Sequence, residues 1–275
     1  SSKRPRILIG KDTRKSGDML EAALTAGLCS MGAKVIPLGV VPTPAVAYLT
    51  RYYKADAGVV ISASHNPCEY NGIKFFNSDG YKLSDGIENE IESYILGEKA
   101  IEELPTHGKV GYVSANHNAV EDYVAFAVST IDCRLDGMKI AVDCANGASY
   151  ETAFKALNKL GANVEAIHNT PDGVNINHMC GSTHMESLQA YVTSIGADIG
   201  IAFDGDADRM LAVDENGKLI DGDQIMAACA KFMRDNGTLK QNTLVATVMS
   251  NLGLFMAGEK IGINIPRTKV GDRYV

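Results

Sequence analysis

Two stretches of the sequence carry side chains whose types and spacing could do chemistry. The first is GVVISASHNPCEYNGIKFF, residues 58–76, in which an apolar run ends at Ser64 and is followed by His65 and, after two turns, by Lys74. Ser64 would lie at the carboxyl end of a buried strand, where open α/β sheets bind their ligands. Its hydroxyl could accept or donate a group, with His65 as proton carrier and Lys74 as charge stabiliser.

The same stretch has a purely structural interpretation. A serine at a strand end often bonds the following turn, and the Asn-Pro dipeptide after His65 favours such a turn. Ser64 is a poor fit to an acyl-transfer nucleophile, because the sequence has no Gly-x-Ser-x-Gly elbow and no Asp-His pair at an evident position to orient a base. Group transfer and turn capping therefore both stay open for Ser64.

The second stretch is IAFDGDADRM, in which Asp204, Asp206 and Asp208 alternate directly after an apolar strand. Three carboxylates this close repel one another unless a cation neutralises them, and hard oxygen ligands suit Mg²⁺. The sixth position is Arg209, where an EF-hand calcium loop has glycine. Arg209 could instead clamp a phosphate bound to the metal. The alternative is a solvated acidic turn.

Together the two stretches suggest phosphoryl transfer, which needs a nucleophile, a divalent ion and cationic clamps. The sequence contains no Gly-x-x-x-x-Gly-Lys-Ser/Thr loop, so we expect a phosphoserine at Ser64, rather than ATP, to store the phosphoryl group. Two other classes remain: a metal-dependent phosphatase, and a non-catalytic piece that binds Mg²⁺ and a phosphorylated small molecule.

Smaller signals surround these two stretches. In GKDTR, Lys11 and Arg14 would reach the same sheet edge and could pair with the phosphate of the serine. They could equally belong to a helix-start loop held by Asp12.

The segment CGSTH, residues 180–184, is either a functional loop or a helix start. We expect Ser182 or Thr183 to cap a helix that begins at His184. Four further histidines lack ligand spacing, and we interpret them as structural or solvated: His107, His117, His168 and His178.

Composition limits the classes of partner. The chain has 275 residues and a formal net charge of −7, which argues against general attraction to nucleic acid or an anionic membrane. It has no apolar run long enough to span a bilayer and no secretory signal pattern. Its six cysteines lack zinc or disulfide spacing, so we expect reduced thiols and a cytoplasmic protein.

The elements that must position these residues alternate short strands with amphipathic helices. Strands are expected at 6–10, 34–40, 57–64, 71–77, 138–146, 163–169, 198–203, 243–250 and 263–270, with a hairpin at 210–220. Helices are expected at 17–32, 43–53, 83–97, 119–131, 150–161, 184–196 and 251–262.

This alternation predicts an α/β fold of tandem related domains with mainly parallel mixed sheets and an antiparallel edge. Residues 97–118 lose the periodicity and suit a linker. We place a first domain at 1–118, a second at 119–238 and the opening of a third at 239–275.

Four motifs in this order, ISASHNP, NGIKFFN, CGSTH and FDGDADR, resemble those of the α-D-phosphohexomutase family. The segments GKDTRKSGDMLEAAL and TKVGDRYV are most similar to the bacterial branch that acts on glucosamine phosphates. The likeness runs over essentially the whole chain. It implies the fold of that family, in which the first three of four domains share an α/β topology.

The resemblance also implies roles for particular residues. Ser64 would carry the phosphoryl group, and Mg²⁺ would be held by Ser64, Asp204, Asp206 and Asp208. The phosphoserine would be lined by His65, Lys74 and Arg209. A loop of the active site would contain Gly271, Asp272 and Arg273.

The implied reaction interconverts glucosamine 6-phosphate and glucosamine 1-phosphate through a 1,6-bisphosphate, and supplies UDP-N-acetylglucosamine for peptidoglycan. Glucosamine or glucose 1,6-bisphosphate would be the activator, a phosphosugar the partner, and a homodimer is compatible with the family. Mannose or glucose phosphates are the alternative substrates. In the family, a further segment would precede Ser1, and a sugar-binding loop and a fourth domain would follow Val275. We therefore expect these residues to hold the phosphoserine and metal half of the site, and not to turn over alone.

Overall fold

The computed structural model describes residues 4–101, 103–116, 118–271 and 274–275. Its first sheet has the strand order β4-β3-β1-β2-β5. The strands are β1 (Arg6–Lys11), β2 (Lys34–Val40), β3 (Ala57–Ile61), β4 (Ile73–Asn77) and β5 (Tyr112–Val113). All pairs are parallel except that of β3 with β4 at the edge. The expected mainly parallel sheet with one antiparallel edge is confirmed.

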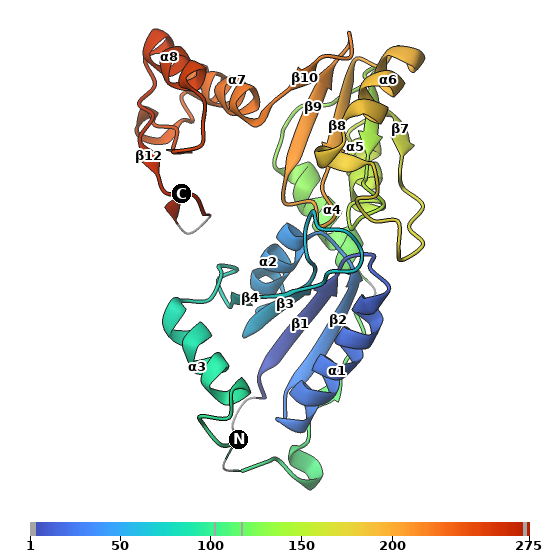
Figure 1. The fold of residues 1–275 in the computed structure, drawn as a ribbon, viewed down its shortest axis with the longest axis vertical. Helices are drawn as coiled ribbons and strands as arrows, with labels where there is room; N and C mark the ends of the chain where they lie inside the picture. Colours follow the sequence, from blue (N-terminus) through green and yellow to red (C-terminus); the bar gives the residue numbers. More distant parts are fainter. Residues whose placement is uncertain (1–3, 102, 117, 272–273) are drawn as a thin grey trace.

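Helices cover both faces of this sheet (Figure 1). On one face, α1 (Ser16–Ser30) packs Leu20, Leu24 and Leu28 against apolar side chains of β1, β2 and β3. On the other face lie α2 (Thr43–Tyr52) and α4 (Ala119–Ser129). The helix α3 (Asp85–Ile95) buries none of its residues. The spacing of the leucines in α1, four residues apart along one face, is what predicted this helix.

The segment predicted to be a linker contains structure. It holds η1 (His107–Lys109) and β5, whose backbone joins β2 through bonds from Tyr112 N to Ala33 O and from Ser114 N to Val35 O. The linker prediction was wrong over these residues. Because β5 is a two-residue edge strand with both side chains exposed, it leaves no apolar alternation to detect.

The second sheet repeats the scheme in the order β10-β9-β8-β6-β7. Its strands are β6 (Lys139–Asp143), β7 (Asn163–Ile167), β8 (Ile199–Phe203), β9 (Met210–Asp214) and β10 (Leu219–Ile220). The strands β6, β7 and β8 are parallel, and β9 and β10 form the predicted antiparallel hairpin. One face packs against α5 (Thr152–Lys159), and the other against α6 (Glu186–Ile195).

The helix α4 joins the two sheets. Phe126 stacks on Tyr48 of α2 with ring centroids 3.8 Å apart. On its other side, Glu121 pairs with Lys155 and Lys159 of α5 at 2.7 and 2.9 Å. This helix therefore contacts both α/β layers and limits their relative movement.

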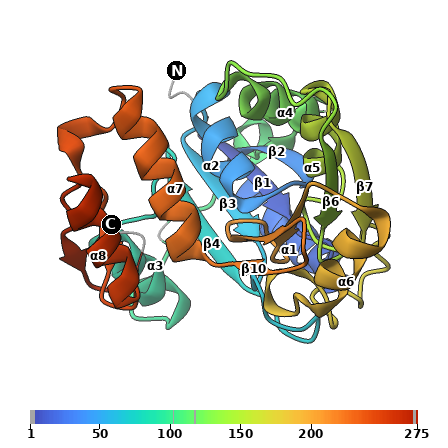
Figure 2. The same cartoon turned by 90° about the horizontal axis from the view of Figure 1, so that it is seen from above.

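A third group of elements follows β10 and lies to one side of the two sheets (Figures 1 and 2). It comprises α7 (Gly222–Asp235), η3 (Lys240–Asn242), β11 (Ala246–Thr247), α8 (Leu252–Ile261) and β12 (Arg267–Thr268). The strands β11 and β12 are parallel, and Ala230 of α7 and Leu254 of α8 are both buried. Because α7 packs on α8, we propose that the third domain begins before α7 rather than at residue 239. Within the described residues, none of the helices has both the length and the hydropathy needed to cross a membrane.

Candidate active site

The loop that carries Ser64 begins where β3 ends. Ser64 lies in the left-handed region with φ 52° and is buried. Its N–H donates to Ser62 Oγ at 3.0 Å, and its own Oγ donates to Asp204 Oδ2 at 2.6 Å. The second bond joins the carboxyl end of β3 to that of β8, in the other sheet. The serine and the acidic loop, 140 residues apart in sequence, thus form one site.

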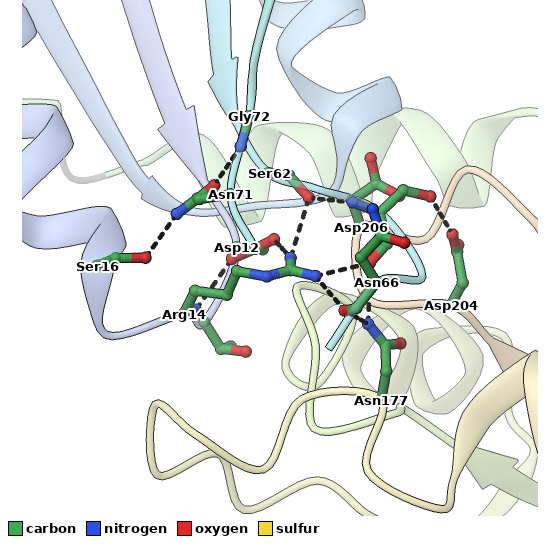
Figure 3. Close-up of polar contacts among 12 residues, drawn as sticks. Asp12, Arg14, Ser16, Ser62, Asn66, Asn71, Gly72, Asn177, Asp204 and Asp206 are labelled. Carbon is green, nitrogen blue, oxygen red and sulfur yellow. Dashed lines mark hydrogen bonds and ion pairs between the residues drawn. The ribbon is translucent and has the colours of Figure 1, made fainter. Parts of the chain in front are cut away.

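Arg14 lies behind this loop. Its guanidinium is fully buried and pairs with Asp12, while donating to the Ser64 carbonyl at 3.1 Å and to the Asn66 carbonyl (Figure 3). Asp12 also accepts from Arg14 N at 2.9 Å. Of the two interpretations of Arg14, the geometry matches the loop held by Asp12. In this structure the arginine supports the backbone of the serine loop.

Lys11 makes its contacts on α1. Its Nζ pairs with Asp18 Oδ1 at 2.6 Å and with Glu21 Oε2 at 2.5 Å. Burial alone would lower the pKa of Lys11, but the bonds to these two carboxylates raise it instead. In this structure the charge of Lys11 is therefore paired with two carboxylates of α1.

The acidic loop follows β8, as predicted. Asp204, Asp206 and Asp208 bring carboxylate oxygens within 4.8 Å of one another. Asp204 and Asp206 are almost completely buried, and Ala207 turns the chain between the second and third carboxylates at φ 55°. Asp208 is exposed, but a cluster with two buried carboxylates differs from the fully solvated acidic turn that remained as the alternative.

Lys74 and Thr43 reach the cluster from the first sheet and α2. Lys74 Nζ lies 2.7 Å from Asp206 Oδ2 and 3.6 Å from Asp208 Oδ2, and Thr43 Oγ1 donates to Asp206 Oδ2 at 2.6 Å. Thr43 N also donates to the Asp206 carbonyl at 2.9 Å. The middle aspartate is thus anchored by side chain and backbone from the opposite domain.

These contacts set the charges of the three carboxyl groups. Burial raises the pKa of Asp204, and the neighbouring charges of Asp206 and Asp208 add to it. Burial also raises the pKa of Asp208. Burial alone would raise the pKa of Asp206 too, but the hydrogen bonds from Lys74 and Thr43 outweigh it and hold that pKa below its usual range.

The donor set fits a divalent cation. Asp206 Oδ1 is buried and, within the described residues, has no hydrogen-bond partner. It belongs to a cluster of three carboxylates faced closely by the single ammonium of Lys74. An unpartnered buried oxygen among clustered carboxylates is the arrangement that a hard cation satisfies.

His65 and Arg209 lie at the rim of the site. Arg209 NH1 is 3.1 Å from His65 Nδ1, and Arg209 Nε is 3.7 Å from Asp208 Oδ1. Both side chains are exposed, so a charged group that approaches the serine would meet them. The structure therefore brings together Ser64, His65, Lys74, Arg209 and the three aspartates.

Sequence comparisons bear on this site directly. Residues 1–102, 120–217 and 221–275 match, in order, alpha/beta/alpha domains I, II and III of the phosphoglucomutase/phosphomannomutase family. The chain belongs to the phosphoglucomutase/phosphomannomutase family. Its members supply the fold that the resemblance predicted, and the α/β class with tandem related domains is confirmed.

Curated relatives align with nearly the whole chain. The phosphoglucosamine mutase of Acetivibrio thermocellus is 62% identical over 271 residues, which are 98% of this chain and 60% of the relative. That of Clostridium acetobutylicum is 61% identical over 272 residues, which are 99% of this chain and 61% of the relative. The chain thus spans about three fifths of the length of these relatives.

Solved structures of the family have the same fold. A phosphoglucomutase/phosphomannomutase family protein from Burkholderia thailandensis matches with a TM-score of 0.80 at 26% identity, over 97% of this chain and 58% of that one. An N-acetylphosphoglucosamine mutase from Aspergillus fumigatus, solved with GlcNAc-6P and magnesium, matches with a TM-score of 0.54 at 19% identity. That match covers 84% of this chain and 60% of the other.

The prediction that CGSTH caps a helix was wrong. Gly181–Thr183 form the short helix η2, and α6 begins at Glu186 after Met185, with no side-chain cap. Gly181, at φ 72°, instead donates its N–H to Asp143 Oδ2 at 2.9 Å. The segment therefore docks on the carboxyl end of the second sheet.

His168 also contacts Asp143, with its Nδ1 atom 2.9 Å from Asp143 Oδ2. Cys180 lies close enough for the three side chains to surround an ion. The carboxylate of Asp143 already accepts bonds from Ala145 N and Gly181 N, so its role is to hold the loops. The structural interpretation of His168 fits this pairing.

Two residues of the site escaped sequence reasoning, Thr43 and Asn177. Asn177 Nδ2 donates to the carbonyls of Ser64 and Asn66 at 2.9 and 3.0 Å. Both residues act across more than 100 positions of sequence, so no local pattern could reveal them. Of the expected C-terminal loop, Gly271 follows β12 in the third group of elements, and Asp272 and Arg273 lie outside the described residues.

Proposed function

We propose that this chain supplies the phosphoserine and metal half of a phosphoglucosamine mutase. Ser64 is the phosphoryl carrier in this proposal, with Lys74, His65 and Arg209 around it. The observation that carries the proposal is the 2.6 Å bond from Ser64 Oγ to Asp204, inside a cluster of three carboxylates. A hydroxyl in that position would place its phosphate directly beside the metal ligands.

Phosphoryl transfer accounts for each group. As phosphoserine gives up its phosphoryl group, the bond from phosphorus to Ser64 Oγ breaks and a bond to a sugar hydroxyl oxygen forms. The hydroxyl proton passes, directly or through His65, to Ser64 Oγ. Lys74 and Arg209 stabilise charge on the transferring group. The reverse transfer from the other phosphate of the bisphosphate restores the phosphoserine.

Asp204, Asp206 and Asp208, with the oxygen on Ser64, would hold Mg²⁺. When bound, Mg²⁺ would neutralise charge on the phosphoryl oxygens. The protein residues prepare the site for it: Thr43 and Lys74 fix Asp206, and their hydrogen bonds hold its pKa low, so it stays ionised. The Aspergillus fumigatus protein of the same fold, solved with magnesium, agrees with this choice of ion.

The substrate proposal rests on the relatives. Two curated proteins that are 61–62% identical over nearly the whole chain are named phosphoglucosamine mutase, which favours glucosamine phosphates over mannose or glucose phosphates. A 1,6-bisphosphate would be the activator, since it can charge Ser64. A glucosamine phosphate substrate suits a cytoplasmic enzyme of peptidoglycan precursor synthesis. A homodimer is compatible with the family.

The test is to charge the serine. The chain is extended with the remaining sequence of the Acetivibrio thermocellus relative, incubated with glucose 1,6-bisphosphate and Mg²⁺, and examined by intact mass and peptide fragmentation. We expect about 80 Da on Ser64, and loss of both the added mass and the mutase activity in Ser64→Ala. Ser129→Ala, an exposed serine on α4, is the matched control.

Two results would overturn the proposal. One is a Ser64→Ala variant that retains the mutase rate of Ser129→Ala. The other is release of inorganic phosphate without any phosphoserine, which would favour a metal-dependent phosphatase.

A further inference from the structure

Ser64 has a backbone conformation that is unfavourable for serine. Its φ of 52° lies in the left-handed region, which a side chain with a Cβ rarely adopts. Such conformations persist only where the surroundings over-determine them, and they gather at functional sites. The groups that hold Ser64 in place are therefore part of the working site.

Two donors grip the carbonyl side of the serine loop, from different domains. Arg14, in the first domain, donates to the carbonyls of Ser64 and Asn66. Asn177, in the loop between β7 and η2 of the second domain, donates from Nδ2 to the same two carbonyls at 2.9 and 3.0 Å. Figure 3 shows the two side chains converging on Asn66.

Asn177 is itself firmly placed. Its side chain is buried, and its N–H donates to the Ala145 carbonyl at 2.9 Å in the loop after β6. Like Ser64, it lies in the left-handed region, with φ 58°. The amide is therefore presented to the serine loop by a fixed backbone.

The acidic loop packs against the contact between Asn177 and the serine loop. A Cβ on Gly205 would lie 2.7 Å from Asn177 Nδ2 and 2.7 Å from the Ser64 carbonyl oxygen. Gly205 stands between Asp204 and Asp206, so the amide, the serine carbonyl and the acidic loop meet at one point. A shift of the Asn177 amide would therefore change the direction of Ser64 relative to the carboxylates.

We propose that Asn177 is a positioning residue for phosphoryl transfer. Together with Arg14 it holds the serine loop from both domains, so that Ser64 Oγ points at Asp204. This inference rests on the proposed function. The Asn177 amide donates to carbonyls of the serine loop and not to the three carboxylates, and Asp206 is held by Thr43 and Lys74. Loss of Asn177 therefore affects the transfer step more than Mg²⁺ binding.

The experiment compares Asn177→Ala and the equal-sized Asn177→Asp with Asn158→Ala, in the extended protein described above. Asn158 is an exposed residue of α5 whose amide donates to the Phe154 carbonyl in its own helix, so the control also removes one side-chain to backbone bond. Measured are kcat, KM, the rate of Ser64 phosphorylation, and Mg²⁺ affinity by calorimetry.

We expect both Asn177 variants to lower kcat and the phosphorylation rate by about 10- to 100-fold, because small misplacements of a reacting group cost that much. KM should stay within about twofold of that of Asn158→Ala, and the Mg²⁺ affinity should fall by less than kcat does, since Ser64 is displaced but the three carboxylates are not substituted. A kcat equal to that of Asn158→Ala would overturn the proposal. So would a parallel loss of Mg²⁺ affinity, which marks a collapsed site.

Hydrogen exchange separates this proposal from the function on which it rests. If the parent protein neither phosphorylates Ser64 nor turns over, the proposed function fails, and exchange of the amides of residues 64–66 still tests the positioning. The role of Asn177 is supported if these amides exchange faster in a folded, soluble Asn177 variant but not in Asn158→Ala. Unchanged exchange contradicts it. Asn177→Asp, which preserves side-chain size, provides this readout if Asn177→Ala does not fold.

Discussion

At the scale of single residues, the site is organised by an excess of negative charge. Asp204, Asp206 and Asp208 cluster at the boundary of two domains, where Lys74 pairs with Asp206 and Asp208, and Arg209 lies near Asp208 at the rim. Burial alone would lower the pKa of Lys74, but the bond to Asp206 and the nearby carboxylate charges raise it, so the lysine stays charged. Charge that remains uncompensated in a buried site is costly, and a divalent ion relieves it.

The residues that carry this charge could be predicted from the sequence, whereas their supports could not. The alternation of the three aspartates after an apolar strand identified the cluster, and the serine before His-Asn-Pro identified its partner. Thr43 and Asn177 remained hidden because a threonine at a helix start and an asparagine in a loop have ordinary local explanations. Only the docking of two domains gives them a further role.

Thr43 offers a test at this scale. Thr43→Val removes the hydroxyl that holds Asp206, so the affinity for Mg²⁺ should fall by about tenfold, as is typical when a group that orients a metal ligand is lost. Thr50→Val is the matched control, because Thr50 is also buried on the same helix and its hydroxyl donates to the Val46 carbonyl. Calorimetric titration with Mg²⁺ that gave equal affinities for the two variants would show that Thr43 does not support the site.

At the scale of elements, apolar periodicity predicted the strands and helices that bury a full face. The long helix α7 was overlooked because its first residues follow a hairpin closely. Its signal was nevertheless present, since Asp221 and Gln224 form a reciprocal capping box at its start. The strand β5 and the helix η2 had no such signal. Backbone pairing with β2 forms β5, and η2 begins at Gly181, which has a positive φ.

The carboxyl ends of β6 and β7 are tied by the pair of Asp143 and His168, which predicts a pH dependence. The hydrogen bond to Asp143 raises the pKa of His168 in the folded protein, although partial burial opposes it. The folded state therefore binds this proton more tightly than the unfolded chain. The pair contributes its full stability below about pH 6.5, the usual histidine value, and loses it as pH rises through the folded pKa.

The measurement is chemical denaturation of the parent protein and His168→Gln from acidic to mildly alkaline pH. The advantage of the parent in free energy of unfolding should be largest at acidic pH and should shrink as pH rises. The same comparison in an Asp143→Asn background should show no such trend. An advantage that grows with pH would contradict this account of the pair.

At the scale of the whole molecule, two α/β layers meet through loops at the carboxyl ends of their sheets. Thr13 Oγ1 donates to the Asn146 carbonyl, Lys15 N to the Gly173 carbonyl, and Thr43 N to the Asp206 carbonyl, each from the first domain to the second. The helix α4 braces the same junction from one side. The site is therefore a property of the docked pair, and neither sheet contains it alone.

Gly205 tests this dependence, because a Cβ there would lie 2.7 Å from both Asn177 Nδ2 and the Ser64 carbonyl oxygen. Backbone and a buried amide cannot yield without moving the domains apart, so Gly205→Ala should lower the free energy of unfolding by about 2 kcal/mol. In a protein of this size that corresponds to a melting temperature lower by about 4 to 8 °C. Gly86→Ala, in α3 where a Cβ would meet open space, should melt no lower than the parent. Calorimetric melting curves that coincide for the two variants would mean that the serine and metal loops do not need their close contact to hold the domains together.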